Sequence, residues 1–167
     1  MGRYKDRYPQ WFKMRVVESG AHTYTAQAFE TPVVAGPSSY YIMNVIGVYY
    51  EFLLGDGAQL VTAKETGGHI QITHDEQTAS LLGDHEDLIH YFSYKAQVLT
   101  EGGVDSHSIF IPCHDGNGNG ILIADKEIWM AIAGDSDMAT ATIGNAWLLY
   151  TMVKVSAQEL LDMLQED

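Results

Sequence analysis

The stretch from Tyr40 to Leu54 is the feature that most limits what this chain can fold into. β-Branched and aromatic residues dominate it, and an extended strand turns alternate side chains to opposite faces. Both alternating sets are apolar here, namely Tyr41, Met43, Val45, Tyr49 and Leu53 on one face and Ile42, Ile46, Val48 and Phe52 on the other. Such a strand belongs at the centre of a sandwich, or has one face in a core and the other against a neighbouring subunit.

Similar short segments recur along the chain between Gly, Pro, Asn and Asp residues. Their apolar residues repeat with a period nearer two than 3.6, which indicates strands. The predicted strands besides 40–54 are 11–17, 22–29, 59–64, 69–73, 88–99, 108–112, 121–124, 128–133 and 140–155. Segment 88–99 also fits a helix, although its aromatic residues favour a strand.

The segments between these strands carry turn signals. Ser19-Gly20 predicts a turn that pairs the first two strands, and Gly67-Gly68 predicts a hairpin. Residues 75–87 are polar and are predicted to form a surface excursion.

The end of the chain predicts a short helix that begins at Ser156. Ser156 and Glu159 have the spacing of a capping box, and Leu160, Leu161 and Leu164 form one apolar stripe. The 167 residues suit a single domain. We therefore predict an all-β fold, a jelly-roll-type antiparallel β-sandwich with a short C-terminal helix, in which residues 1–10 are a basic N-terminal arm and 11–167 a single sandwich domain.

Charge is distributed unevenly between the N-terminus and the rest of the chain. The first fifteen residues carry a net charge of +4 and the remainder −17, which together give −13. The five cations of the N-terminal segment are Arg3, Lys5, Arg7, Lys13 and Arg15, interleaved with Tyr4, Tyr8, Trp11 and Phe12. Cations with aromatic neighbours suit a polyanion or a membrane surface, whereas the alternative is a solvated chain end before a first strand that buries Trp11 and Phe12.

The chain shows no targeting or membrane signal, since no apolar signal-peptide core follows the N-terminal charges and the longest apolar run is too short for a spanning helix. Its one cysteine, Cys113, excludes an internal disulfide. Cys113 beside His114 suggests a nucleophile, but neighbouring strand residues face opposite ways, so a small core residue is the favoured interpretation.

The segment from Asp115 to Gly120 resembles the start of a calcium loop. Asp115, Asn117 and Asn119 occupy ligand positions one, three and five, and Gly120 occupies position six. Position twelve needs a bidentate carboxylate, but it is Lys126. A Gly/Asn-rich turn between two strands is therefore favoured over a calcium site.

The seven histidines, among them the candidate pairs His85 with His90 and His107 with His114, lack the spacing of a zinc or iron site. No phosphate-binding loop or catalytic triad is apparent either. We expect neither an enzyme nor a bound cofactor.

The order of these features resembles the single-jelly-roll capsid (coat) proteins of small icosahedral viruses. The resemblance covers the basic arm before Trp11-Phe12, the strand that ends at 30–33, the apolar strand 41–52, the turn 115–120 running into Ile121-Leu122-Ile123-Ala124, and the closing 147–155 strand with its helix. It implies a virion protein, assembled in the host cytoplasm, that forms a symmetric shell with copies of itself. It also implies an arm that faces the viral genome or an internal membrane, with a second capsid protein as a further partner. The arm is shorter than the arginine-rich arms of many such coats.

Two other functions fit a sandwich. One is a carbohydrate- or receptor-binding module that uses Trp129, Trp147 or the tyrosines as stacking platforms, with calcium at 115–120 as an option. The other is a cupin-like metalloenzyme, which shares the jelly-roll architecture.

Overall fold

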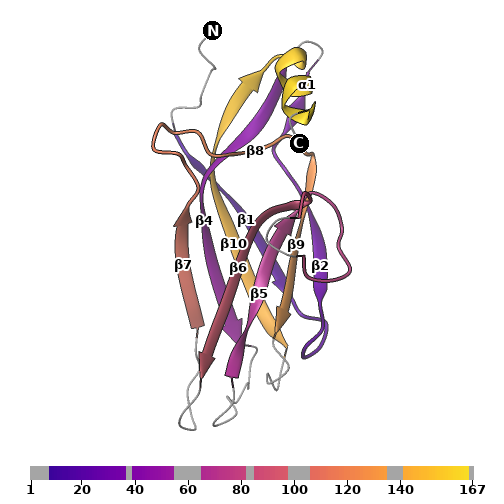
Figure 1. Cartoon of the computed structure of the whole chain (residues 1–167), viewed down its shortest axis with the longest axis vertical. Coiled ribbons are helices and arrows are strands. Elements are labelled where there is room, and N and C mark those ends of the chain that lie inside the picture. Colours follow the sequence, from indigo (N-terminus) through magenta and orange to yellow (C-terminus); the bar gives the residue numbers. More distant parts are fainter. Residues whose placement is uncertain are drawn as a thin grey trace.

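The computed structural model describes residues 8–36, 39–54, 65–81, 85–97, 106–134 and 141–165. Within these residues the chain forms two facing antiparallel sheets and one helix (Figure 1). The elements are β1 (Gln10–Val17), β2 (Thr25–Glu30), β3 (Val34–Ala35), β4 (Tyr40–Leu54), β5 (Glu65–Thr73), β6 (Leu88–Gln97), β7 (Ser106–Pro112), β8 (Ile121–Ile123), β9 (Glu127–Gly134), β10 (Thr142–Val155) and α1 (Ala157–Gln165).

The strands are paired in a nested order. Sheet A has the order β1-β10-β4-β3, with β7 and β8 also pairing with β4, and sheet B has the order β2-β9-β5-β6. Early strands pair with late ones, β1 with β10, β2 with β9 and β4 with β7 and β8, until β5 meets β6. The chain is thus one long hairpin rolled into two sheets, which is a jelly roll. The predicted fold class is confirmed.

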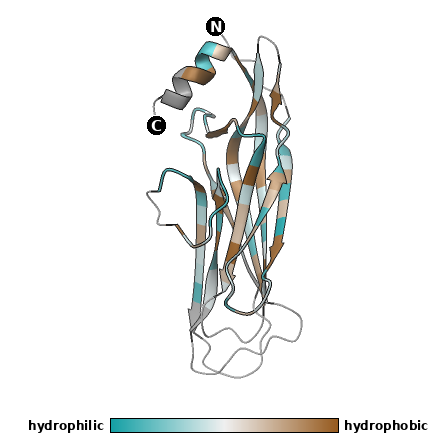
Figure 2. Ribbon diagram, turned by 90° about the vertical axis from the view of Figure 1, so that its right-hand side faces the viewer, coloured by the Kyte–Doolittle hydropathy of each residue, from teal (hydrophilic) through white to brown (hydrophobic). Residues whose placement is uncertain are grey.

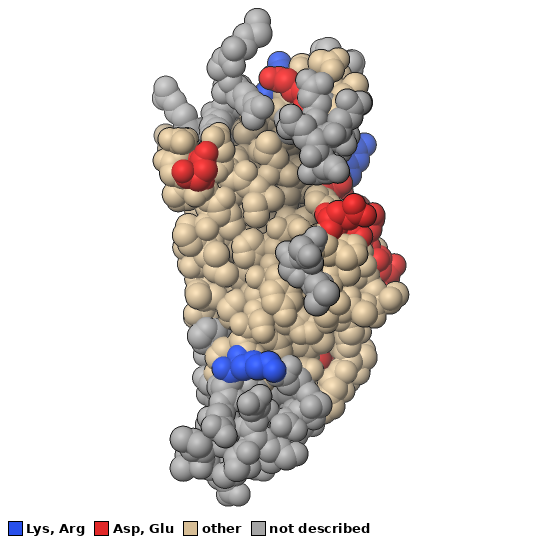
Figure 3. All heavy atoms as spheres, viewed as in Figure 1, with Lys and Arg blue, Asp and Glu red and all other residues tan. Residues whose placement is uncertain are grey.

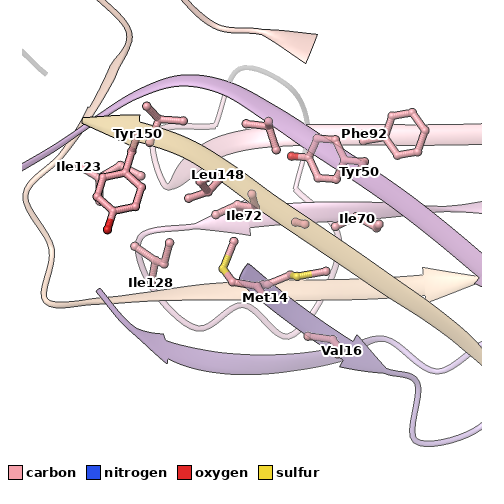
Figure 4. Packing of buried hydrophobic residues seen from close by; sticks show 14 of the residues in the cluster. Met14, Val16, Tyr50, Ile70, Ile72, Phe92, Ile123, Ile128, Leu148 and Tyr150 are labelled. Carbon is pink, nitrogen blue, oxygen red and sulfur yellow. The ribbon is translucent and has the colours of Figure 1, made fainter. Parts of the chain in front are cut away.

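The core lies between the sheets, and strands of both contribute to it (Figure 4). Its largest fully buried side chains include Tyr50 and Phe52 from β4 and Ile70 and Ile72 from β5. Each such side chain contributes about 1.5–3 kcal/mol on burial. The sandwich is therefore stabilised mainly by apolar side chains that the two-residue period turns inward.

The central strand β4 has two buried faces along only part of its length. Near its start both Ile42 and Met43 are fully buried, because Ile42 packs with Val153, Val155 and the partly buried Leu160 of α1. Further along, the inward Tyr50 is buried whereas the outward side chains are only half-buried. The prediction of two buried faces is correct only for the end that α1 covers.

The helix α1 packs at one end of the sandwich (Figure 2). The predicted capping box is present, since the Glu159 carboxylate accepts from the Ser156 amide at 2.8 Å and the Ser156 hydroxyl accepts from the Glu159 amide at 3.2 Å. The predicted stripe is only partly correct, because Leu160 packs on the sheet while Leu161 is 52% exposed. Among the described residues, no helix is long and apolar enough to cross a membrane.

Two predicted hairpins are wrong. β1 and β2 do not pair, because β1 joins β10 in sheet A while β2 joins β9 in sheet B. Gly67 and Gly68 lie inside β5, where a Cβ on Gly68 would meet the Phe52 ring at 2.6 Å. Glycine there provides a close approach between the sheets rather than a turn.

The ambiguous segment 88–99 contains the strand β6. The predicted strand 59–64 lies outside the described residues.

Candidate interaction surface

The outward side of sheet A carries a row of aromatic side chains. Strand pairing places Trp147 beside Tyr49, and Tyr49 beside Phe110, on three neighbouring strands. The Trp147 and Tyr49 rings are 5.1 Å apart between centroids. Lys13 pairs with Trp147 from β1, and its Nζ lies 4.6 Å from the centroid of that ring. The register thus brings four distant parts of the sequence into one row.

Trp11 completes this cluster from the edge strand. Its ring lies edge-on to Trp147 and to Phe110, with centroid distances of 6.3 Å and 6.4 Å. The end of the Phe110 ring occupies the space over Gly47, where a Cβ would lie 2.3 Å from its Cζ atom. Trp11 is 45% exposed and Phe110 46% exposed. We call Trp11, Tyr49, Phe110 and Trp147 the aromatic face.

Two cations border the aromatic face. Lys13 and Arg15 alternate with buried residues on β1, so both point outward and are exposed. Within the described part of the chain, no ion pair involves either residue. Glu51 on the same side accepts a hydrogen bond from the Asn145 side-chain amide at 2.8 Å. Exposed aromatic side chains beside cations are typical of contact surfaces.

The outward side of sheet B is different, because the chain itself covers part of it. Gln71 and Thr73 alternate with inward residues of β5, yet they are 0% and 1% exposed. The Gln71 amide donates to the Tyr24 hydroxyl at 2.6 Å and its carbonyl accepts from the Leu81 amide at 3.0 Å. The Thr73 hydroxyl donates to the Asp75 carbonyl at 2.7 Å. Segment 74–81 therefore folds back over this sheet.

Two of the five residues of the predicted cationic site lie within the described residues. Lys13 and Arg15 lie on the sheet beside the aromatic face. Arg3, Lys5 and Arg7 lie outside the described residues, and contact of any of the five cations with a genome or the shell interior stays a prediction.

The calcium candidate forms a tight turn between β7 and β8. The Asp115 carboxylate accepts from the Asn117 amide at 2.8 Å, the Asn119 amide at 3.1 Å and the Asn119 side chain at 2.8 Å. These bonds, led by the one from the Asn119 side chain, lower the pKa of Asp115. Gly116 and Gly118 have φ of 85° and 84°, as turn glycines do. The loop's own donors thus already bind both carboxylate oxygens, and calcium binding stays an untested prediction.

A buried amide anchors this turn to the core. Asn44 of β4 accepts from the Gly120 amide at 2.7 Å and donates to the Gly118 carbonyl at 3.2 Å. Its side chain is 2% exposed. The turn is therefore held by a buried polar residue of an otherwise largely apolar strand.

Several of the histidine and cysteine candidates have local hydrogen-bond or ion-pair partners. Across the described ranges, no group of three His, Cys, Asp or Glu side chains could hold a metal. His85 Nδ1 lies 3.6 Å from the Asp87 carboxylate, and His90 Nδ1 lies 2.9 Å from the Tyr50 hydroxyl. Cys113 packs against the core, and burial raises the pKa of its thiol, which disfavours the reactive thiolate.

Sequence reasoning missed the aromatic face as a unit. It noted Trp11 and Trp147 separately, but their contact depends on pairing between β1 and β10. Alternation in 108–112 turns Phe110 to the other face of the strand from Ile109 and Ile111. This pattern was the sequence signal that Phe110 points outward.

No protein-family model matches the chain, and no curated protein matches it in sequence. Solved structures do match. VP1 of KI polyomavirus, an unassembled pentamer, has a TM-score of 0.52 at 10% identity, with 93% of this chain and 98% of that chain covered. VP1 of Merkel cell polyomavirus, also an unassembled pentamer, has a TM-score of 0.52 at 9% identity, with 90% and 97% covered.

A third match is VP1 of Trichodysplasia spinulosa-associated polyomavirus in complex with 3'-sialyllactose, with a TM-score of 0.53 at 8% identity and coverages of 90% and 97%. The fold is that of the VP1 capsid proteins. The predicted likeness to a jelly-roll capsid protein is thereby confirmed for the fold. The VP1 fold extends over most of the chain, including both sheets.

Proposed function

We propose that this chain is a structural capsid protein that assembles with copies of itself into an icosahedral shell. The observation that carries the proposal is the VP1 fold over 93% of the chain. The exposed aromatic face supports it, because a subunit needs apolar surface to bury against its neighbours. The protein acts in the virion and has no catalytic role.

Particle sizing and negative-stain microscopy of the purified chain test this function. We expect symmetric oligomers or closed particles whose proportion rises with protein concentration. A strict monomer at high concentration in several salts contradicts the proposal.

The arm is assigned to the inside of the shell. In this arrangement residues 1–10 are an arm and 11–167 a single sandwich, and Arg3, Lys5 and Arg7 contact the genome or an internal membrane. Many subunits together give a dense positive lining whose binding weakens with salt. Assembly takes place in the host cytoplasm, with a second capsid protein as a further partner.

Nuclease protection of nucleic acid co-purified with the particles tests the arm. A variant with Arg3→Gln, Lys5→Gln and Arg7→Gln should protect less nucleic acid, and protection by the natural chain should fall as salt rises. Equal protection by both chains at every salt concentration contradicts genome binding by the arm.

Receptor glycan binding is a second candidate function. The VP1 of Trichodysplasia spinulosa-associated polyomavirus was solved with 3'-sialyllactose and with GM1 oligosaccharide. Trp147 is half-buried on the outward side of sheet A, and a sugar that stacks on its ring must first displace Lys13, whose Nζ lies over that ring. This function is supported if either glycan raises the melting temperature of the natural chain but not that of Trp147→Leu. It is contradicted if neither glycan changes the melting temperature of the natural chain.

A further inference from the structure

The segment between β5 and β6 is rich in acidic residues. We call residues 74–81 and 85–87 the acidic segment, because they contain Asp75, Glu76, Glu86 and Asp87, and the sequence has no lysine or arginine between residues 65 and 94. Asp75, Glu76 and Glu86 are exposed. Figure 3 shows acidic side chains gathered on the right of the molecule, at the level where Figure 1 draws this segment.

The acidic segment is held in place on the sandwich. The His74 amide donates to the Asp87 carbonyl at 2.9 Å, and His74 Nδ1 lies 2.7 Å from the Asp125 carboxylate. Gln71 and Thr73 bind the segment from below, as described above. Its carboxylates are therefore displayed on a fixed surface, so less entropy is lost when they bind a partner.

The acidic segment and the aromatic face lie on opposite sides of the molecule. The segment covers the outward side of sheet B through Gln71, whereas Trp147 and Lys13 lie on the outward side of sheet A. One copy cannot bring the two together within itself. A contact between them must join two copies.

We propose, on the basis of the shell-forming function above, that the aromatic face of one copy binds the acidic segment of a second copy. Trp11 and Phe110 provide the apolar centre of the contact, and Lys13 and Arg15 face carboxylates of the neighbour. Charge complementarity selects a second copy as the occupant, because residues 16–167 of this chain carry a net charge of −17.

This contact is heterologous, because each copy uses two different surfaces. A heterologous contact closes into a ring when its rotation allows and otherwise extends without limit. Each copy in a closed ring offers one aromatic face and receives one from its other neighbour. When its rotation closes the ring, the contact supplies a cyclic unit for a shell.

Charge reversal in the full-length chain tests the contact. The first variant is Lys13→Glu with Arg15→Glu, the second is Asp75→Lys with Glu76→Lys, and the third combines all four changes. The control, Lys95→Glu with Lys154→Glu, makes the same change in net charge at two exposed lysines away from Lys13, Arg15 and residues 74–81. Sedimentation velocity gives the assembled fraction, and circular dichroism melting confirms that each variant folds.

We expect the first and second variants to weaken assembly by about tenfold in protein concentration. The combined variant should recover most of it, because both partners have exchanged sign, and the control should behave like the natural chain. Recovery in the combined variant cannot be explained by misfolding.

Three outcomes overturn the proposal. If the natural chain and the first variant assemble equally, the contact is wrong while the shell function stands. If the first variant assembles normally but loses binding to single-stranded DNA, the cations bind nucleic acid instead. If the natural chain itself stays monomeric, the shell function fails, and this contact fails with it.

Discussion

The Tyr50 hydroxyl and Nδ1 of His90 lie 2.9 Å apart in the space between the two sheets. Tyr50 comes from β4 and His90 from β6, so this bond crosses the sandwich. Burial raises the pKa of Tyr50 well above its usual value and lowers the pKa of His90. Both groups are neutral at neutral pH, and a neutral imidazole can accept the bond that the hydroxyl donates.

Acid should weaken the sandwich through His90. Because the folded-state pKa of His90 lies below its unfolded value, the unfolded chain binds the proton first as pH falls. The free energy of unfolding therefore keeps its full value above about pH 6.5. Below that pH it falls through protonation of His90 by at most about 1.4 kcal/mol per pH unit. Urea unfolding at pH 7.5, 6.5 and 5.5 should show a shallower decline for His90→Gln than for the natural chain. The control is His114→Gln at an exposed histidine, which should decline as the natural chain does. If stability falls as steeply with pH in His90→Gln as in these two chains, His90 is not the cause of the acid sensitivity.

Replacement of Glu18 by glutamine should destabilise the fold. Its carboxylate is 4% exposed and accepts from the Gly134 amide at 2.6 Å and from the Thr142 amide and hydroxyl, both at 2.7 Å. In Glu18→Gln one oxygen becomes an NH₂ group that faces donors. We expect a loss of about 1–3 kcal/mol in the free energy of unfolding by urea. The exposed Glu30→Gln is the control, and an equal effect of both changes would contradict a role for these bonds.

The positions of the strands could largely be predicted from the sequence, but their partners could not. The bounds of β4 match the predicted 40–54, because its alternation and apolar content leave little choice. The partner of β1 lies about 130 residues away in β10, so no local pattern reveals it. Ser19-Gly20 looks like a hairpin turn locally, yet the Glu18 amide bonds the distant Thr142 carbonyl at 3.0 Å.

The candidate site was predictable only in fragments for the same reason. The cations Lys13 and Arg15 were identified by their charge, and Trp147 as an aromatic platform. That Lys13, Trp147, Tyr49 and Phe110 form one row follows from three long-range registers. Composition identifies such residues, and only pairing brings them together.

The two neighbouring leucines of α1 should behave differently. Leu160 packs against Ile42, Val153 and Val155, whereas Leu161 is 52% exposed. Leu160→Ala should lower the free energy of unfolding by about 2 kcal/mol, because a partly buried side chain is lost. Leu161→Ala should change it by less than about 0.5 kcal/mol. Equal effects in urea unfolding would show that α1 packs through a different face.

Gly47 and Phe110 should be strongly coupled. Whether Gly47→Ala lowers or raises the free energy of unfolding should depend on whether Phe110 is present. A Cβ on Gly47 would lie 2.3 Å from the Phe110 ring, so Gly47→Ala must displace that ring from its place beside Trp11. We expect a loss of about 1 kcal/mol in the free energy of unfolding. In a Phe110→Ala background the space is open, and Gly47→Ala should instead stabilise the strand by about 0.5–1 kcal/mol, because alanine restricts the unfolded chain more than glycine does.

A double-mutant cycle measures this coupling directly. Urea unfolding of the natural chain, both single variants and the double variant gives the interaction energy, and near-ultraviolet circular dichroism reports the packing of Trp11 and Trp147. Additive effects would mean that the Phe110 ring does not lie over Gly47. Sign reversal would establish that the missing side chain at Gly47 is what allows Phe110 to pack beside Trp11, so that one glycine of β4 shapes the outward surface of sheet A.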